Sequence, residues 1–194
     1  MTKRLVLASY LIAVVLLAFS GCEPSPSKTT KKADLAKFIL RVNCAAFDPY
    51  IDKAGNEWLP DQDMKEGLKW GAVLGNIGDH GELDMTGTDA PEIYETERYG
   101  LEAYEFIVPN GKYTVRLHFA ENYEGITGVG QRVFSVTING RTVLENFDPF
   151  KVGGFGKPIV KKFKGVAVKD GKLNIGFIPN IENPEINGIE VFSE

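Results

Sequence analysis

Apolar and polar residues alternate with a period of two along the second half of the chain. The inward positions of four such runs are Tyr104, Phe106 and Val108; Tyr113, Val115, Leu117 and Phe119; Phe134, Val136 and Ile138; and Leu173, Ile175 and Phe177. Period two is typical of strands with one face in a core. The run at residues 186–192 predicts a last strand, and no helical period of useful length follows residue 21. The expected fold is all-β, an antiparallel β-sandwich of jelly-roll type.

Tight-turn dipeptides separate these runs. They are Asn110-Gly111, Asn139-Gly140 and Asp170-Gly171. Each tolerates the positive φ values of a two-residue hairpin loop, so each predicts a hairpin between the strands on either side of it.

Residues 48–91 are less regular and rich in Gly, Asp, Asn and Pro. They are expected to form long loops with a few short strands. Trp58 and Trp70 lie in this stretch and are expected to be buried to hold the loops, with sugar stacking as the alternative. Cys44 lies in the strand-like run that begins at Phe38 and is expected to be a small buried apolar residue.

The amino-terminal residues have the pattern of an export signal. Lys3 and Arg4 precede an apolar run at residues 5–19, and Ser20-Gly21-Cys22 resembles a bacterial lipobox. The resulting division is a signal peptide at 1–21, a lipidated Cys22 with a flexible tether at 22–37, and a folded domain at 38–194. Acyl chains such as palmitate on Cys22 would hold the protein on a membrane. The expected location is the bacterial cell envelope, at the outer membrane or cell surface.

The charge balance is acidic. The 194 residues carry a formal charge of −4, and loss of the signal would remove two basic residues and no acids. Nucleic acid is not an expected partner, because its phosphates require clustered Lys and Arg.

Recognisable catalytic motifs are absent from the sequence. His80 and His118 are the only histidines, and neither a nucleophile elbow nor a metal-binding cluster of Cys and His appears. No cofactor is expected. A glycosidase needs only two carboxylates at the right separation, so hydrolysis of sugars stays open as the less favoured alternative.

Three tyrosines mark the edges of a candidate binding face: Tyr94 and Tyr99 on one side and Tyr123 on the other. Tyrosine rings pack against the C–H face of a pyranose, and strand-to-loop junctions carry binding sites. The alternative is that these rings cover the open end of the sandwich. Glu97 and Arg98 are expected to form an ion pair with each other rather than to bind ligand.

Four linked blocks resemble the malectin domain. They are I-Y-E-T-E-R-Y-G, G-K-Y-T-V-R-L-H-F-A-E-N-Y, G-Q-R-V-F-S-V-T-I-N-G-R-T-V-L-E-N-F-D-P-F and F-I-P-N-I-E-N-P-E-I-N-G-I-E-V-F. The similarity runs from about Phe38 to Phe192. It implies a non-catalytic, jelly-roll-like sandwich that binds an oligosaccharide or polysaccharide of glucan type, beside a neighbouring carbohydrate-active enzyme.

By the same resemblance, Tyr99 and Tyr123 stack on sugar, and Glu182 with Asn183 bonds its hydroxyl groups. Two positions depart from the family pattern. Glu124 replaces the phenylalanine that follows the second tyrosine, and no tyrosine occurs at residues 71–87. Glu124 is therefore expected to contact a more polar sugar. The alternative function is an envelope protein-interaction module that has lost sugar binding.

Overall fold

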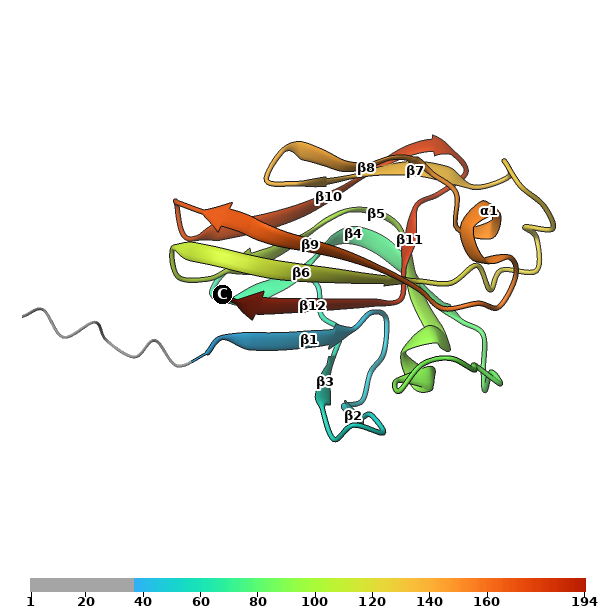
Figure 1. Ribbon diagram of the computed structural model, residues 1–194, viewed down its shortest axis with the longest axis horizontal. Helices are drawn as coiled ribbons and strands as arrows, with labels where there is room; N and C mark the ends of the chain where they lie inside the picture. The colour runs from blue at the N-terminus through green and yellow to red at the C-terminus, as the bar shows by residue number, and fades with distance from the viewer. Residues whose placement is uncertain (1–36) are drawn as a thin grey trace, which may run out of the picture. The chain divides into compact units, whose positions relative to one another are not determined.

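The computed structural model describes residues 37–194, which form two facing β-sheets (Figure 1). The first sheet consists, in spatial order, of β2 (Tyr50–Ile51), β3 (Glu57–Pro60), β1 (Ile39–Asn43), β12 (Gly188–Ser193), β6 (Gly111–Phe119) and β9 (Ile159–Val168). The second consists of β11 (Glu185–Ile186), β5 (Thr96–Ile107), β10 (Lys172–Ile181), β7 (Val133–Ile138) and β8 (Arg141–Phe147), with β4 (Trp70–Asp79) also paired to β5. The predicted all-β sandwich is confirmed. Among the paired strands of residues 37–194, β1 and β3 run parallel and the other pairs are antiparallel.

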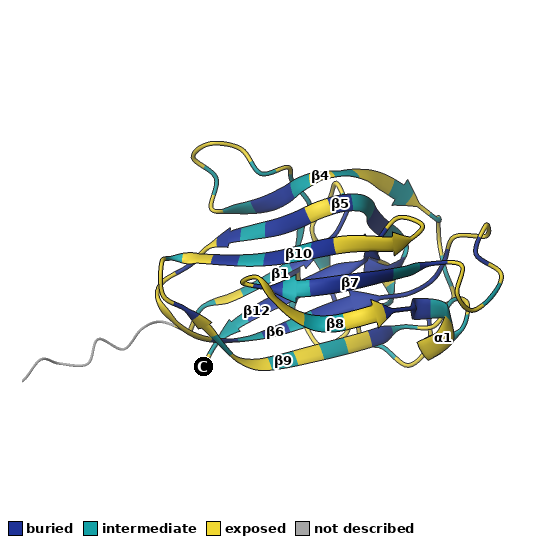
Figure 2. Ribbon diagram, turned by 90° about the horizontal axis from the view of Figure 1, so that it is seen from above, coloured by how far each residue is buried: buried dark blue, intermediate teal, exposed yellow. Residues whose placement is uncertain are grey.

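The core lies between the sheets and is built from the alternating positions of the sequence. Figure 2 shows the buried residues on strands of both layers. The rings of Phe119 and Phe147 have centroids 4.9 Å apart, and Phe134 meets Phe147 edge to face at 5.5 Å. Such contacts add about 0.5–1.5 kcal/mol per aromatic pair to the gain from burial.

Only one of the three predicted hairpins closes. Asn139 and Gly140 have φ values of 49° and 74° and join the paired strands β7 and β8. The turn at Asn110 instead leads from β5 in the second sheet to β6 in the first, and the turn at Gly171 leads from β9 to β10 in the opposite direction. The two predictions are wrong because turn chemistry is local, whereas the partner of a strand is set by packing. Gly171 donates its backbone N–H to Asn110 Oδ1 at 2.8 Å, so the two crossings support each other.

The prediction of only short strands within residues 48–91 is also wrong. β4 has ten residues and pairs with β5 along most of its length. A bulge between Val73 and Leu74 breaks the alternation, and three glycines hide the strand pattern. Gly71 is required there, because a Cβ atom at this position would lie 2.6 Å from the Met64 backbone nitrogen.

Trp58 is buried, as expected, whereas Trp70 is only partly buried and packs against the core. Trp58 Nε1 donates to Asp52 Oδ2 at 3.0 Å. Trp70 stacks on Phe106 with ring centroids 6.5 Å apart. Cys44 is fully buried, as predicted.

Two short helices shape the loops next to the candidate site: η1 (Pro91–Tyr94) and α1 (Pro149–Gly153). Asp148 caps α1 by accepting the Lys151 N–H at 2.9 Å, and its other oxygen accepts the Gly130 N–H at 2.7 Å. One carboxylate therefore holds both the helix and the loop before β7. Neither helix in residues 37–194 has the length and apolar character needed to cross a bilayer. The expected signal peptide, Cys22 and most of the tether lie outside the described residues.

Candidate functional site

A pocket of about 440 Å³ opens where β4 ends and β5 begins. The edge of β5 that faces away from β4 pairs with β11 at Arg98 and Tyr99 and with β10 from Ala103 to Ile107. The chain between β10 and β11, residues 182–184, leaves the sheet there. That diverging loop forms one wall of the pocket. The lining residues are Ile77, Gly78, Asp79, His80, Glu97, Tyr99, Tyr123, Arg132, Glu182 and Asn183. Four of the five predicted sugar-contacting residues therefore lie together.

Two tyrosine rings face this pocket from rigid backbone. Tyr99 sits in β5 between Asn76 of β4 and Glu185 of β11 and is partly exposed. Tyr123 follows β6, and the residue is 52% exposed. Its N–H donates to Glu121 Oε1 at 3.2 Å and its carbonyl accepts the Ile126 N–H at 2.9 Å. The backbone is fixed while the ring stays open, which is the arrangement that sugar stacking requires.

Glu182 and Asn183 belong to the diverging loop that forms one wall. Glu182 has a φ of 59°, and its Oε1 accepts a hydrogen bond of 2.9 Å from the Asn183 side-chain amide. The Asn183 carbonyl accepts from Arg132 Nη1 at 2.9 Å. Gly100 lies beneath this wall with a φ of 64°, and its N–H donates to the Pro184 carbonyl at 2.8 Å. The polar side chains of this loop are therefore held next to Tyr99.

The floor of the pocket is a buried charge cluster around Arg132. Its guanidinium bonds the Glu121 carboxylate through Nε at 2.7 Å and Nη2 at 3.3 Å. Burial raises the pKa of Glu121, although Arg132 acts in the opposite direction. Glu185 lies in the same cluster with no hydrogen-bond partner for either carboxyl oxygen. Burial and the charge of Glu97 raise the pKa of Glu185 well above its usual range.

Glu97 connects this cluster to the pocket. The residue is 3% exposed, lines the pocket, and has an Oε2 atom without a hydrogen-bond partner. That atom lies 3.3 Å from His80 Nε2, which is within ion-pair distance but without hydrogen-bond geometry. The expected pairing of Glu97 with Arg98 is wrong, because neighbouring strand residues point to opposite faces. Arg98 instead pairs with Asp61 at 2.7 Å and Asp63 at 3.1 Å.

Tyr94 does not belong to the binding face. It is fully buried, and its hydroxyl lies 3.0 Å from His118 Nδ1. Burial raises the pKa of the Tyr94 hydroxyl. The prediction failed because Tyr94 ends the helix η1, which turns its side chain under the loop rather than outward.

A second pocket, of about 460 Å³, adjoins the first and shares Asp79, His80 and Tyr123 with it. Glu124 lies here, on the far side of Tyr123 from Tyr99. This pocket also contains Phe155, 47% exposed, which sequence reasoning missed. An aromatic residue between glycines, G-G-F-G, was the available signal. The adjoining pockets provide an aromatic surface longer than one sugar ring.

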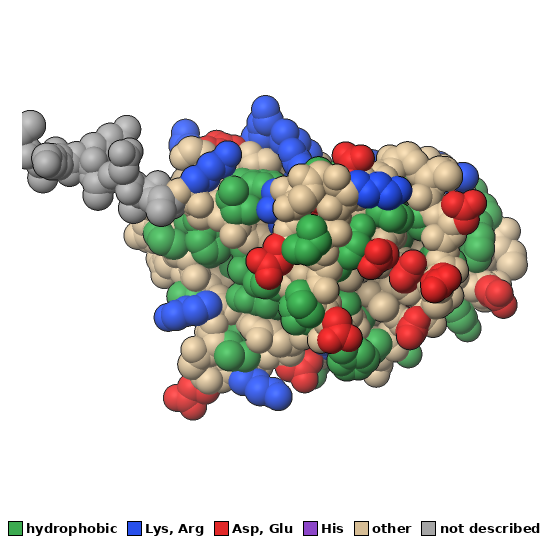
Figure 3. Space-filling view, turned by 90° about the horizontal axis from the view of Figure 1, so that it is seen from below, with side chains coloured by type: hydrophobic (Ala, Val, Ile, Leu, Met, Phe, Trp, Pro, Cys, Tyr) green, Lys and Arg blue, Asp and Glu red, His purple; other side chains and the backbone are tan. Residues whose placement is uncertain are grey.

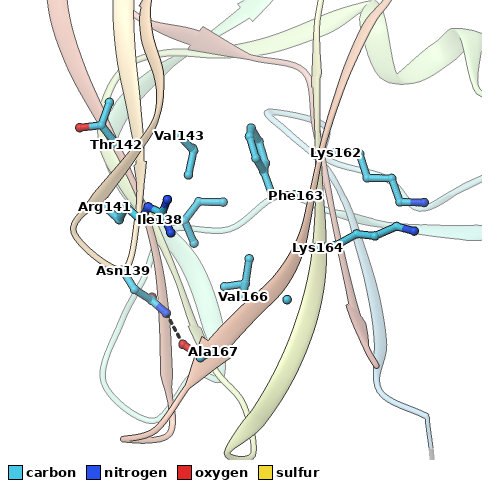
Figure 4. A pocket seen from close by; sticks show the side chains of 11 residues that line it. Ile138, Asn139, Arg141, Thr142, Val143, Lys162, Phe163, Lys164, Val166 and Ala167 are labelled. Carbon is cyan, nitrogen blue, oxygen red and sulfur yellow. Dashed lines mark hydrogen bonds between the residues drawn. The ribbon is translucent and has the colours of Figure 1, made fainter.

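A third hollow, of about 630 Å³, lies between the edge strands β8 and β9 (Figure 4). Apolar side chains of Ile138, Val143, Phe163 and Val166 line it, while Lys162 and Lys164 point away from it. The Asn139 amide is already bonded to the Ala167 carbonyl at 3.0 Å. No carboxylate lines this hollow, in contrast to the pocket beside Tyr99.

Metal binding has no support among the described residues, where no group of three or more His, Cys, Asp or Glu side chains is arranged to hold an ion. The groups that the pocket beside Tyr99 offers a ligand are aromatic rings, carboxylates, an amide, the His80 imidazole and the paired Arg132 guanidinium.

The sequence model of the malectin domain matches residues 38–189. The chain belongs to the malectin domain family. Malectin-A of Xenopus laevis is 33% identical over 194 aligned residues, which cover 90% of this chain and 65% of that protein. A probable LRR receptor-like serine/threonine-protein kinase of Arabidopsis thaliana is 37% identical over 168 residues, covering 72% of this chain and 16% of the kinase. The chain thus spans less than two thirds of the length of these relatives.

Solved structures agree with this malectin fold. A Bacteroides uniformis beta-glucuronidase superposes with a TM-score of 0.74 and 25% identity over 81% of this chain and 18% of the enzyme. The plant receptor-like kinase FER superposes with a TM-score of 0.64 and 24% identity, over 82% of this chain and 51% of the kinase structure, and this second likeness concerns the fold alone. Malectin homologues support assignment of the domain as a carbohydrate-binding module.

Proposed function

We propose that this domain binds a glycan without cleaving it, in the pocket between Tyr99 and Tyr123. The observation that carries the proposal is the concave shape of the site: two accessible tyrosine rings enclose a space of about 440 Å³ with acceptors at its floor and wall. A flat apolar patch at Tyr123 would instead favour a protein partner. Glu182 and Asn183 bond the sugar hydroxyls, and Glu97, at the floor of the pocket, accepts a hydrogen bond from the sugar.

The test is a glycan array probed with residues 35–194, which form a compact unit of their own. We expect one class of glycan to bind, with a Kd of about 10 µM to 1 mM. The variants Tyr99→Ala and Tyr123→Ala should both lose it while keeping the wild-type circular dichroism and melting temperature. No binding to any glycan by the folded protein would reject the proposal and turn attention to a protein partner.

The absence of catalysis is part of the proposal. Its support is the family and the site, which offers stacking surfaces but no recognisable catalytic motif. A panel of chromogenic glycosides should give no product with the wild-type domain. Release of product that disappears with a single carboxylate variant, such as Glu97→Gln or Glu182→Gln, would establish a hydrolase instead.

The second part of the proposal is a lipid anchor at Cys22 that places the domain at a bacterial cell envelope. Its support is the sequence Ser20-Gly21-Cys22 after a basic and apolar leader. The full chain expressed in bacteria with labelled palmitate should incorporate the label and fractionate with membranes. A Cys22→Ala variant should do neither, and equal labelling of both proteins would refute the anchor.

A further inference from the structure

We infer that the glycan bound by this domain carries free amino groups, and that its ligand class is a positively charged oligosaccharide of amino sugars. This inference rests on the proposed function of the same pockets, the first beside Tyr99 and the second beside Phe155. It concerns the charge of the ligand, which family membership leaves open.

The lining of the two pockets is strongly acidic. Its carboxylates are Asp79, Asp84, Glu97, Glu124 and Glu182. Arg132 is the one Lys or Arg side chain among the lining residues, and it is already paired with Glu121 at 2.7 Å. Figure 3 shows acidic side chains gathered toward the end of the domain away from residue 37, with most lysines and arginines elsewhere on this face.

These carboxylates lack internal cations. Ion pairs within residues 37–194 join acids to Arg, Lys or His, and none involves Asp79, Asp84, Glu124 or Glu182. The fifth carboxylate, Glu97, has only His80 beside it, with its Oε2 atom 3.3 Å from His80 Nε2. Carboxylates that share a partly enclosed space repel one another, and a bound cation relieves that repulsion. An anionic sugar would meet the same charges as a barrier. A uronic acid is therefore the least suitable ligand for this cleft.

Buried acceptors point in the same direction. Asn122 Oδ1 in the second pocket has no hydrogen-bond partner, and Glu97 Oε2 in the first has only His80 Nε2 at 3.3 Å, without hydrogen-bond geometry. Asn122 is 5% exposed, and its amide nitrogen is fixed by donating to the Tyr94 carbonyl at 2.8 Å, which leaves the oxygen as a free acceptor. An ammonium group offers three donors and no acceptor, so it matches both the charge and the hydrogen-bonding deficit of these pockets.

Aromatic rings explain why the cation would belong to a sugar. Tyr99, Tyr123 and Phe155 present accessible rings along the two pockets. A sugar ring covers such faces with its C–H bonds, and an amino substituent next to them is also attracted by the π electrons. A simple polyamine would satisfy the carboxylates but leave these faces open.

The experiment compares four tetrasaccharides by calorimetry with residues 35–194 at pH 5.5: β-1,4-linked glucosamine, N-acetylglucosamine and glucose, and α-1,4-linked galacturonate. The acetylated sugar is the matched neutral control. We expect glucosamine to bind at least tenfold more tightly than N-acetylglucosamine, galacturonate not to bind, and the glucosamine affinity to fall as NaCl rises from 50 to 300 mM. Glu124→Gln should reduce the preference for glucosamine severalfold. Glu102→Gln, an exposed acid of β5 outside both pockets, should leave it unchanged.

Other outcomes overturn the inference in distinguishable ways. Equal or tighter binding of a neutral tetrasaccharide, lost in Tyr99→Ala, would refute the amino-sugar ligand and leave the proposed function standing. Binding of glucosamine that survives both Tyr99→Ala and Tyr123→Ala would show attraction by charge alone and would also refute it. No binding of any sugar on this panel or on the glycan array, by folded protein, would reject the proposed function as well.

Discussion

The ring of Tyr123 lies in the space that a Cβ atom on Gly125 would occupy. Gly125 has no left-handed φ that would itself demand glycine. Glycine is therefore required at position 125 by the neighbouring Tyr123 ring rather than by its backbone conformation. The lack of a side chain at position 125 lets the Tyr123 ring lie at the junction of the two pockets.

Gly125→Ala should displace the Tyr123 ring and weaken glycan binding at least tenfold, about 1.4 kcal/mol. Because both residues are exposed, the melting temperature should change little. Calorimetry with the glycan identified on the array measures the effect. Gly128→Ala is the control, since a Cβ atom there meets only the Gln131 side chain at 4.0 Å. Unchanged affinity in the Gly125 variant would show that the ring position does not matter for binding.

Phe155→Ala should weaken binding of a tetrasaccharide more than binding of a disaccharide, because the second pocket accommodates the further sugar units. The expected loss for the longer ligand is about 0.5–1.5 kcal/mol, the range of a single aromatic contact. Phe47→Ala, which removes a ring that is 80% exposed and outside both pockets, should have no effect on either ligand. Equal losses of binding free energy for the disaccharide and the tetrasaccharide would show that Phe155 does not contact the further sugar units.

Glu185 should lower the stability of the fold at neutral pH. Its pKa is raised by burial and by Glu97, so above the ordinary glutamate pKa of about 4.3 the folded protein binds more protons than the unfolded chain. The free energy of unfolding then falls as the pH rises through that window, by up to about 1.4 kcal/mol per pH unit. Glu185→Gln removes this titration and should be the more stable protein at pH 7.

Urea unfolding of both proteins from pH 4 to pH 8 tests this expectation. The stability difference should shrink toward pH 4, where the carboxyl is protonated in both states. A stability difference that does not vary with pH, or a variant less stable than the wild type at pH 7, would contradict a raised pKa for Glu185.

Asp61 and Asp63 bind the same arginine but should differ greatly in their contribution to stability. The Asp61 side chain is 3% exposed, and its Oδ2 accepts from Arg98 at 2.7 Å, Tyr104 at 2.8 Å and the Ala45 N–H at 2.7 Å. Asp61→Asn should cost about 3–5 kcal/mol because it leaves a buried guanidinium without its main counter-charge. The Asp63 side chain is 60% exposed, so Asp63→Asn should cost at most about 1 kcal/mol. Similar losses in urea unfolding would show that burial does not govern this pair of contacts.

Sequence patterns predicted the layers of this protein better than its connections. The alternation around Val115 and Leu117 predicted the correct inward face, because successive side chains of a strand point to opposite faces and the apolar ones turn to the core. The turn at Asn110 misled, since a chain that leaves one strand through a tight turn can pair beside it or cross to the facing sheet. Only contacts distant in sequence decide between them.

The residues of the candidate site were also predicted only in part. Tyr99, Tyr123, Glu182 and Asn183 were predicted from family motifs to bind sugar, and the structure brings them to one pocket. Glu97 and Phe155 were missed for different reasons. The first looks like one half of a strand ion pair, and its orientation depends on the other strands of the sheet. The second reaches the pocket through the loop after α1, whose path no periodic pattern describes.

The chain enters and leaves the sandwich at the end opposite the two pockets. Ile39 pairs with Phe192 near both termini, whereas Asn43 and Gly188 pair at the other end, next to the strands that carry the site. Residue 37 therefore lies at the end of the domain away from the two pockets (Figure 1). The described domain can be attached through residue 37 to a bead, a sensor chip or another protein without obstructing access to its ligand.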